Sequence, residues 1–172
     1  MNGRSCAILG PEPSRFPWGY DEEDERSGAL KLILLNMVNY WLVEDIKSFI
    51  VALDAGIGLY AAELIGGLRE KNPEISLKCI VPWEEQATKW TPDLRERYYN
   101  AQALCSEVET VSSEYTTSCE VGSKLRAIDL ADLVFAVSAR EEDPFLEIEL
   151  HYARRTNKNV LVFDSDKSDF HN

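Results

Sequence analysis

Two glycines separated by one residue, Gly56 and Gly58, follow an apolar run and precede a helical pattern. At a strand-to-helix turn, glycines let backbone N–H groups approach a phosphate, and such a pair is half of a dinucleotide-binding fingerprint. The full fingerprint is absent, and a tight turn between a strand and a helix explains the same spacing. Gly56 and Gly58 are therefore candidate ligand contacts, with both interpretations open.

A second group of candidate residues lies at 82–90, where aromatic and polar side chains follow another apolar run. An aromatic ring and a carboxamide could stack on a planar ligand and hydrogen-bond it. Packing of the rings onto a sheet is the alternative, and it is favoured for Trp90. The segment therefore indicates Pro82, Glu84 and Gln86 as its better ligand candidates.

The loop Pro17-Trp18-Gly19-Tyr20 is the third segment with ligand-binding potential. Trp18 and Tyr20 could each cover a pocket or anchor the loop on the core, because both rings combine a large apolar body with a polar atom. Anchoring is favoured for one of the two. Both residues remain candidate ligand contacts.

The remaining residue types do not assemble a catalytic constellation. His151 and His171 stand too far apart to argue a pair, and no Ser-His-Asp, Cys-His or His-rich pattern is present. Arg97 could reach a ligand crevice, but a helical pattern that also contains Arg95 and Glu96 is more typical of a solvated surface. The sequence predicts no catalytic residue, no metal site and no cofactor.

The elements that must position these candidates are short apolar runs alternating with longer helical patterns, which is typical of βαβ units around a parallel sheet. Strands are expected at 6–9, 48–53, 77–81, 110–112, 133–137 and 160–163. Helices are expected at 23–43, 58–71, 92–105, 123–130 and 144–156. The polar residues 164–172 are expected to form a flexible tail.

These elements predict a single α/β domain over residues 1–172. It is a three-layer, Rossmann-like, doubly wound and mainly parallel sheet of about six strands with helices on both faces. In such a sheet the ligand crevice lies beyond the carboxyl ends of the strands, near the topological switch point. The loops at 10–20, 53–58, 82–90 and 139–144 should therefore surround one rim.

Composition excludes several partners. A formal charge of −12 argues against nucleic acid, because binding a polyanion requires Lys and Arg to neutralise phosphates. The longest apolar stretch, 29–43, is interrupted by Lys31, Asn36 and Asn39 and is shorter than the roughly 20 residues of a membrane span. No signal peptide is apparent, so we expect a cytoplasmic protein with no membrane partner. Self-association remains open.

The four cysteines Cys6, Cys79, Cys105 and Cys119 have no metal-ligand spacing. Cys6 and Cys79 lie within apolar runs that are typical of strands. We expect reduced and mostly buried thiols, with a disulfide or a zinc site as the less favoured alternatives.

Short motifs distributed over nearly the whole chain resemble the YpsA-like family of the SLOG superfamily, the Rossmann-like group that includes DprA and the cytokinin-activating LOG enzymes. No single motif is decisive, but their order and spacing together are specific. The motifs are Ile8-Leu9-Gly10-Pro11-Glu12-Pro13, Pro17-Trp18-Gly19-Tyr20-Asp21-Glu22, Phe49-Ile50, Ala55-Gly56-Ile57, Ala61-Ala62-Glu63, Pro82-Trp83-Glu84-Glu85-Gln86, Trp90, Arg97-Tyr98, Tyr115-Thr116 and Asp132-Leu133. The resemblance implies a Rossmann-like nucleotide-binding fold and adds Gly10 and Pro11 to the candidate ligand contacts.

The chain departs from the family pattern at the expected crevice. An Arg of relatives is here Glu12, their Ser-Gly pair is Val51-Ala52, and an Asp is Gly58. Their Arg-Asn pair aligns with Ser123-Lys124, and their phosphate-cradling Gly-Gly-Thr aligns with Pro144-Phe145-Leu146. These departures put the relatives' ligand in doubt.

The start of the last expected helix illustrates the physical effect. Asp143-Pro144 is typical of an N-cap followed by a proline at the first helical position, which leaves fewer free N–H donors. Glu141 and Glu142 add negative charge at the same end. Each charge about 6 Å from a phosphate costs roughly 0.7–3 kcal/mol, against a dipole attraction of about 0.3–2 kcal/mol. This end is expected to be closed to phosphate unless a metal ion or Arg140 intervenes.

Three functions follow in order of preference. The first is a non-catalytic binder of a small nucleotide-like or otherwise planar ligand, or a protein that has lost that ligand. The second is a nucleotide N-glycosidase related to LOG enzymes, whose catalytic Glu would correspond to Glu147 or Glu149. Without the preceding glycines both glutamates are better explained as partners of the helix dipole or as solvated residues at a helix start. The third is an interaction module for protein partners.

Overall fold

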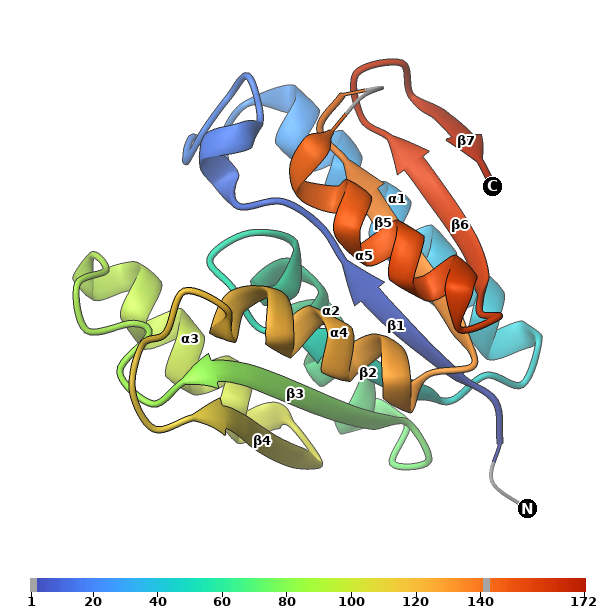
Figure 1. The fold of residues 1–172 in the computed structure, drawn as a ribbon. Coiled ribbons are helices and arrows are strands. Elements are labelled where there is room, and N and C mark those ends of the chain that lie inside the picture. The colour runs from blue at the N-terminus through green and yellow to red at the C-terminus, as the bar shows by residue number, and fades with distance from the viewer. Residues whose placement is uncertain (1–2, 141–142) are drawn as a thin grey trace.

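The computed structural model describes residues 3–140 and 143–172, and within them six parallel strands and one antiparallel strand form a single sheet (Figure 1). The strand order is β4-β3-β2-β1-β5-β6-β7. The strands are β1 (Ser5–Leu9), β2 (Ser48–Ala52), β3 (Ser76–Trp83), β4 (Glu107–Ser112), β5 (Leu133–Ser138), β6 (Asn159–Asp164) and β7 (Asp169–His171). The α-helices are α1 (Glu25–Val43), α2 (Ile57–Lys71), α3 (Pro92–Leu104), α4 (Cys119–Leu130) and α5 (Pro144–Arg155), and a short 3-10 helix covers Pro13–Arg15.

The sheet separates two helical layers, with α1, α2 and α3 on one face and α4 and α5 on the other (Figure 1). Alternating strand residues supply two cores, because successive side chains point to opposite faces. Ile8 and Phe49 belong to the core beneath α1–α3, whereas Ala7 and Ile50 belong to the core beneath α4 and α5. The expected three-layer, Rossmann-like sheet is confirmed.

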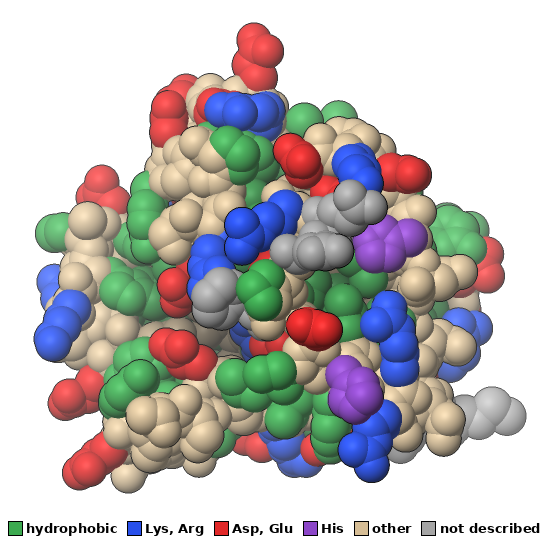
Figure 2. All heavy atoms as spheres, turned by 45° about the horizontal axis from the view of Figure 1, so that its top comes forward, with side chains coloured by type: hydrophobic (Ala, Val, Ile, Leu, Met, Phe, Trp, Pro, Cys, Tyr) green, Lys and Arg blue, Asp and Glu red, His purple; other side chains and the backbone are tan. Residues whose placement is uncertain are grey.

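The chain reverses its direction across the sheet between β4 and β5. Strands β1 to β4 are added one after another in one direction, and α4 then returns the chain so that β5 pairs with the other side of β1. The topological switch therefore lies between β1 and β5, where the loops that follow these strands separate. Around this end of the molecule acidic, basic and apolar side chains are interspersed rather than segregated by type (Figure 2).

The C-terminal segment differs from its expected form as a flexible tail. Asp169–His171 form β7, which pairs antiparallel with β6 through Phe170 and Phe163. The Asp164 carboxylate accepts backbone hydrogen bonds from Asp166 and Lys167, which closes the turn, and the two phenylalanine rings lie 5.0 Å apart. A side chain-to-backbone turn and one aromatic pair thus order a polar segment that composition alone assigns to a tail.

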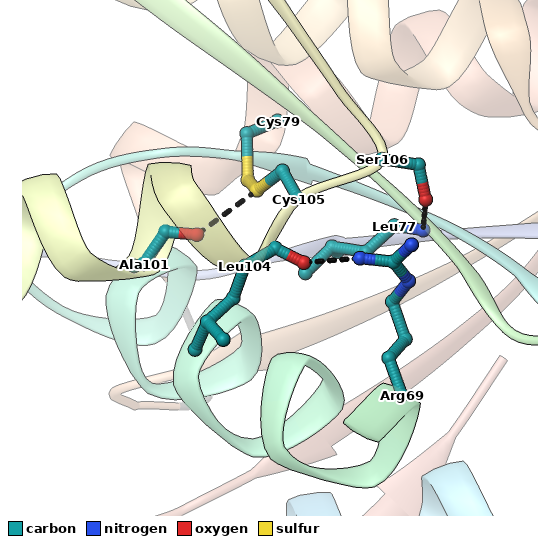
Figure 3. Close-up of a disulfide and its surroundings, with 7 residues drawn as sticks. All are labelled: Arg69, Leu77, Cys79, Ala101, Leu104, Cys105 and Ser106. Carbon is teal, nitrogen blue, oxygen red and sulfur yellow. Dashed lines mark hydrogen bonds between the residues drawn. A yellow bond between two sulfur atoms is a disulfide. The ribbon is translucent and has the colours of Figure 1, made fainter. Parts of the chain in front are cut away.

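A disulfide joins Cys79 in β3 to Cys105, the residue after α3 (Figure 3). Their Cα atoms are 6.4 Å apart, within the usual range for a disulfide. The expectation of reduced thiols is wrong for this pair, because helix α3 returns along β3 and brings together two residues that are distant in sequence. It is confirmed for Cys6 and Cys119, which are free and buried. Beside the disulfide, the Arg69 guanidinium donates to the backbone carbonyl of Leu104.

Candidate functional site

A pocket of about 150 Å³, called here the inner pocket, lies where β1, β2 and β3 end beneath helix α4. Residues from the loops after these strands form one side, and residues from α4 and α5 form the other. The pocket is lined by Pro11, Glu12, Arg15, Ala52, Leu53, Asp54, Pro82, Gln86, Glu120, Val121, Ser123, Lys124 and Glu149. The loops at 10–20, 53–58 and 82–90 therefore meet around a cavity beyond the strand ends, as expected. Described residues of the loop at 139–144 line a different pocket, so the expectation that all four loops surround one rim is wrong for this loop.

Asp54, two residues after β2, is the central acidic group of the inner pocket. Its Oδ1 accepts hydrogen bonds from the backbone N–H groups of Gly56 at 2.8 Å and of Gly58 at 3.0 Å. Burial raises the pKa of Asp54 to about 7, against the opposing effect of the nearby Lys124 charge. The N-terminus of α2, which can attract an external anion, thus already holds an internal carboxyl group.

The three candidate glycines lie at points of close backbone packing. A Cβ on Gly58 would overlap the Ala52 carbonyl oxygen, and a Cβ on Gly56 would overlap the Pro11 carbonyl oxygen. A Cβ on Gly10 would overlap the Ile57 side chain. Each glycine therefore has a structural reason that requires no ligand, although all three lie beside the inner pocket.

Lys124 of α4 and Glu149 of α5 close the other side of the inner pocket. Glu149 is only 1% exposed, and its Oε1 lies 3.6 Å from the Lys124 Nζ. Among the described residues, its Oε2 has no hydrogen-bond partner. A buried carboxylate with one long ion pair is under-compensated, since buried charges normally require close partners and several hydrogen bonds.

Glu149 and Glu147 were both expected to be partners of the helix dipole or solvated surface residues, and their environments in the structure differ. The expectation is wrong for Glu149, which lies on the buried face of α5 together with Leu146 and Ala153. It is confirmed for Glu147, which is exposed and lines a separate pocket of about 690 Å³ beside Arg140. The spacing Leu146–Glu149–Ala153 follows the helical period, and this pattern could have identified the buried glutamate.

A larger pocket of about 860 Å³, called here the outer pocket, adjoins the inner pocket and shares Glu12, Gln86 and Glu120 with it. We call the two pockets together the crevice. The outer pocket is lined by Glu12, Trp83, Glu84, Glu85, Gln86, Thr88, Lys89, Trp90, Ser113, Glu114, Tyr115 and Glu120. The Trp83 and Tyr115 rings meet edge to face with their centroids 5.1 Å apart.

The candidate residues at 82–90 divide between the two pockets. Pro82 and Pro11 line the inner pocket, and Glu84 is an exposed residue of the outer pocket. The Gln86 carboxamide is buried, where it donates to the Leu53 carbonyl at 3.0 Å and accepts from the Tyr98 hydroxyl at 3.2 Å. Gln86 therefore ties the loop to its surroundings through both ends of its amide.

Trp18 and Tyr20 have different environments. Trp18 is buried, stacks on Phe16 with ring centroids 4.6 Å apart, and has the Arg26 guanidinium 5.6 Å from its ring. Tyr20 is 61% exposed, and burial together with the negative charges of Glu12 and Asp54 raises its pKa. Trp18 thus has the environment of an anchor, and Tyr20 lies near the inner pocket without lining it.

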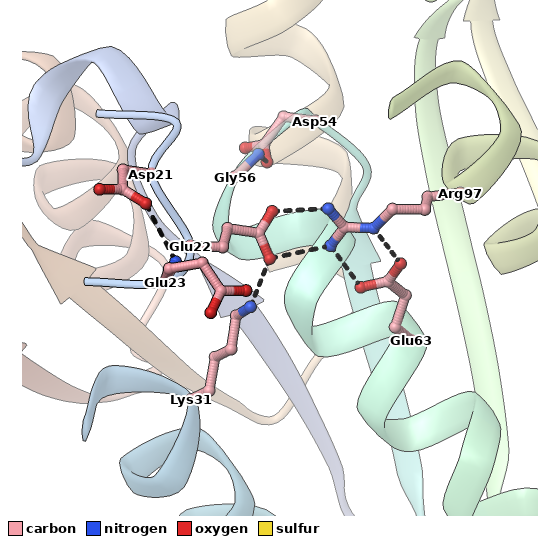
Figure 4. Close-up of polar contacts among 8 residues, drawn as sticks. All are labelled: Asp21, Glu22, Glu23, Lys31, Asp54, Gly56, Glu63 and Arg97. Atoms are coloured by element: carbon pink, nitrogen blue, oxygen red, sulfur yellow. Dashed lines mark hydrogen bonds and ion pairs between the residues drawn. The ribbon is translucent and has the colours of Figure 1, made fainter. Parts of the chain in front are cut away.

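Arg97 links the loop after β1 to helices α2 and α3 (Figure 4). Its guanidinium donates two hydrogen bonds to Glu63, at 2.7 and 2.8 Å, and two to Glu22, at 2.5 and 3.3 Å. Glu22 also pairs with Lys31 of α1. Burial opposes the ionised form of Glu22, but hydrogen bonds from Arg97 and Lys31 lower its pKa. We call Glu22, Lys31, Glu63 and Arg97 the rim clamp, because they hold the loop of residues 10–24 against the helices.

The predicted closure of the α5 N-terminus is only partly visible, since Glu141 and Glu142 lie outside the described residues. Pro144 is the first residue of α5, as expected, and the Asp143 carbonyl accepts a hydrogen bond from Leu146 N–H at 3.1 Å. The charge argument at this helix end remains a prediction.

Asp54 and Glu149 are the two buried carboxyl groups of the inner pocket. Sequence reasoning did not single out Asp54, and it weighed Glu149 as a catalytic residue but favoured a structural role for it. For Asp54 a signal existed, because an Asp two residues before a glycine at the end of a strand has the spacing of an Asx turn, in which the carboxylate accepts the N–H group two residues on. Within residues 3–140 and 143–172, no three His, Cys, Asp or Glu side chains are grouped so that they could hold a metal ion. None of the described helices is both long and apolar enough to cross a membrane.

The family model YpsA, described as the YspA SLOG family, matches residues 6–129. This match covers β1 to α4 and therefore most of the crevice, but it ends before β5 and α5.

Three curated bacterial relatives illustrate the distance to known sequences. The UPF0398 protein of Enterococcus faecalis is 21% identical over 95 residues, which is 55% of this chain and 53% of that protein. The UPF0398 protein YpsA of Bacillus subtilis is 28% identical over 93 residues, which is 54% of this chain and 51% of the relative. A UPF0398 protein of Bacillus cereus is 24% identical over 115 residues, or 66% and 61% of the two chains. The chain thus spans about half the length of the first relatives that it matches.

Proposed function

From the premise that this chain belongs to the YpsA family of SLOG proteins, we propose that its crevice binds a small, planar, nucleoside-like ligand and does not hold a phosphate. One observation carries the proposal: the Asp54 carboxyl group occupies the Gly56 and Gly58 N–H groups at the start of α2. At this helix end, which borders the inner pocket, two N–H groups that could bind an external anion are therefore already hydrogen-bonded to a side chain of the protein.

The energies at this helix end favour exclusion of phosphate. A helix N-terminus attracts an anion by about 0.3–2 kcal/mol. An ionised Asp54 about 6 Å from a phosphate charge repels it by roughly 0.7–3 kcal/mol, depending on the local dielectric. Glu12, which also lines the inner pocket, adds a charge of the same sign. Repulsion exceeds the dipole attraction as long as Asp54 is ionised, which with a pKa of about 7 requires a pH above neutral.

The outer pocket supports the planar part of the proposal. Trp83 and Tyr115 lie edge to face along its wall, and the pocket volume of about 860 Å³ is within the range of small-molecule sites. Aromatic side chains stack on any planar ring without demanding a particular hydrogen-bond pattern. A base would therefore lie against Trp83 or Tyr115.

Calorimetric titration of the protein with adenosine, AMP and ATP tests this function. We expect adenosine to bind at least as tightly as AMP, and AMP to bind more tightly than ATP. In Asp54→Asn, which keeps an oxygen acceptor for Gly56 and Gly58, the affinity for AMP relative to adenosine should rise about tenfold, equivalent to 1.4 kcal/mol. Tighter binding of ATP than of adenosine by the unaltered protein would contradict the proposal.

A nucleotide N-glycosidase is the second candidate, and the pairing of Asp54 with Glu149 in one pocket favours it. Because burial raises the pKa of Asp54 to about 7, this carboxyl group could exchange a proton near neutral pH. This function predicts release of free adenine from AMP or adenosine, and its loss in Asp54→Asn. Chromatography of a reaction at high protein concentration measures the free adenine. If no free adenine is found, the protein is not a nucleotide N-glycosidase.

A further inference from the structure

The crevice carries an excess of negative charge. Seven carboxyl side chains and three cationic side chains line the inner and outer pockets together. In the inner pocket, Lys124 lies near two of these carboxyl groups, Asp54 and Glu149. Such a lining favours a positively charged occupant, because complementary charge stabilises a ligand most where protein surrounds it.

An independent observation comes from Glu149. This side chain is almost completely buried and lines the inner pocket, yet its Oε2 accepts no hydrogen bond from any residue that the structure describes. Within the part of the chain that the structure describes, its one ion pair, with the Lys124 Nζ, is 3.6 Å long. A buried carboxylate oxygen normally has a donor, so Glu149 is a side chain of the inner pocket whose charge the described residues leave incompletely compensated.

The aromatic rings of the outer pocket point to the same class of ligand. Elsewhere the protein places its own cations over ring faces: Arg26 lies 5.6 Å from the Trp18 ring, and Lys31 lies 4.7 Å from the Tyr60 ring. Over the described part of the chain, no such cation lies on Trp83 or Tyr115, which share their pocket with exposed glutamates. An aromatic face beside carboxylates attracts a delocalised organic cation through its ring quadrupole.

We propose that the crevice selects a planar cation, a nucleoside-like ring with a delocalised positive charge, over its neutral counterpart. The ring lies against Trp83 or Tyr115, and its N–H groups face the carboxylates at the junction with the inner pocket. This inference rests on the proposed function and adds the charge of the ligand to it.

Two isomeric nucleosides test the charge alone. 1-Methyladenosine binds a proton and is therefore a cation at pH 7, whereas its isomer N6-methyladenosine is neutral. Calorimetric titration should give at least tenfold tighter binding for 1-methyladenosine, as expected for one cation–π contact together with a carboxylate partner. The preference should weaken as salt is raised, because the glutamates of the outer pocket are exposed.

Glu→Gln substitutions, each of which removes one negative charge, test which carboxylates cause the preference for the cation. Glu120→Gln, at an exposed residue shared by both pockets, should lower the affinity for 1-methyladenosine about threefold to tenfold and leave that for N6-methyladenosine unchanged. Glu149→Gln should act in the same direction, and circular dichroism checks that this buried variant folds. Glu44→Gln, an exposed position beside Tyr40 at the end of α1, carries the same charge change and should alter neither affinity.

The outcomes separate the two proposals. Equal or tighter binding of N6-methyladenosine overturns the cation inference and leaves the binding of planar nucleosides intact. Binding of neither isomer and no binding of adenosine overturns the proposed function and the inference with it. A preference for the cation that survives in Glu120→Gln and in folded Glu149→Gln, or that is lost in Glu44→Gln, also overturns the inference, because the charge would then be sensed elsewhere.

Discussion

The rim clamp and the inner pocket are two groups of charged side chains at the same end of the sheet, and each places a long cation between two carboxylates. In the rim clamp, Arg97 donates hydrogen bonds of 2.5–3.3 Å to Glu22 and Glu63, and Lys31 adds a second cation. In the inner pocket, Lys124 lies 3.6 Å from a more deeply buried Glu149.

The rim clamp and the inner pocket differ in how completely the charged side chains are compensated by ion pairs and hydrogen bonds within the protein. The rim clamp has two cations for two carboxylates, and its geometry is that of a two-sided guanidinium fork. The inner pocket has more carboxylates than cations and leaves an oxygen of Glu149 without a donor. A satisfied network stabilises the scaffold, whereas an incompletely satisfied one in a cavity indicates a place for a ligand. This contrast yields four predictions.

Lys124→Met should have the largest effect, because it removes the cation nearest to Asp54 and Glu149. We expect the free energy of unfolding to fall by about 3 kcal/mol, as when one partner of a buried ion pair is removed. Urea denaturation followed by circular dichroism measures this loss. The double variant Lys124→Met, Glu149→Gln should recover much of it, because the uncompensated charge is then absent. A loss below about 0.5 kcal/mol, as at an ordinary surface position, would mean that Lys124 does not hold these carboxylates.

The pH dependence through Asp54 should be the next largest effect. Burial raises its pKa from 3.8 to about 7, so between these values the folded protein retains a proton that the unfolded chain has lost. Stability therefore falls as pH rises through this window and levels off above pH 7. Between pH 5 and pH 8 the fall is roughly 3 kcal/mol, about 1.4 kcal/mol for each pH unit below the raised pKa.

Asp54→Asn provides the control for this titration. It keeps an acceptor for Gly56 and Gly58 and cannot ionise, so its stability should vary less between pH 5 and pH 8 than that of the unaltered protein. Urea midpoints at several pH values give the comparison. Parallel pH profiles for the two proteins would show that Asp54 is ionised in the folded state throughout this range.

Arg97→Met breaks the rim clamp and should cost less, because its members are about one quarter to one third exposed and solvent screens them. We expect a loss of about 1–2 kcal/mol, between the values for exposed and buried pairs. Arg95→Met on the same helix, whose side chain is exposed, should change stability by less than about 0.5 kcal/mol. Equal effects of the two substitutions would make the rim clamp an ordinary surface contact.

The scaffold of this site could be predicted from the sequence, because the spacing of apolar residues and the lengths of the connecting segments determine it. The continuous runs that form β1, β2 and β5 predicted strands covered on both faces, and their order predicted where the crevice lies. The close packing around Gly58 was foreseen only as one of two alternatives. A pattern of glycines cannot tell whether a backbone oxygen or a phosphate takes the place of the missing Cβ.

The chemistry of the site was less accessible, because it depends on contacts between residues far apart in sequence. Lys124 meets Glu149 across two helices, and Cys79 meets Cys105 only once α3 has returned along β3. The rim clamp likewise joins Glu22 to Arg97, which the sequence alone placed on a solvated surface. The spacing of apolar residues along a helix or strand predicts which of its faces is buried. Which residue of another element a side chain will contact follows only from the three-dimensional arrangement.

The smallest expected effect is the most discriminating, since it compares the same substitution in both regions. Glu149→Gln removes a charge that has one long ion pair, so stability should change by less than about 1 kcal/mol or should increase. Glu63→Gln removes a carboxylate with two short hydrogen bonds to Arg97, so it should lose about 0.5–1 kcal/mol despite being more exposed. Urea denaturation of both variants at low and high salt measures the two changes, and only that of Glu63→Gln should diminish with salt. If neutralising Glu149 instead destabilised the protein more than neutralising Glu63, the inner pocket would be the better satisfied of the two networks, and the argument for a ligand there would fail.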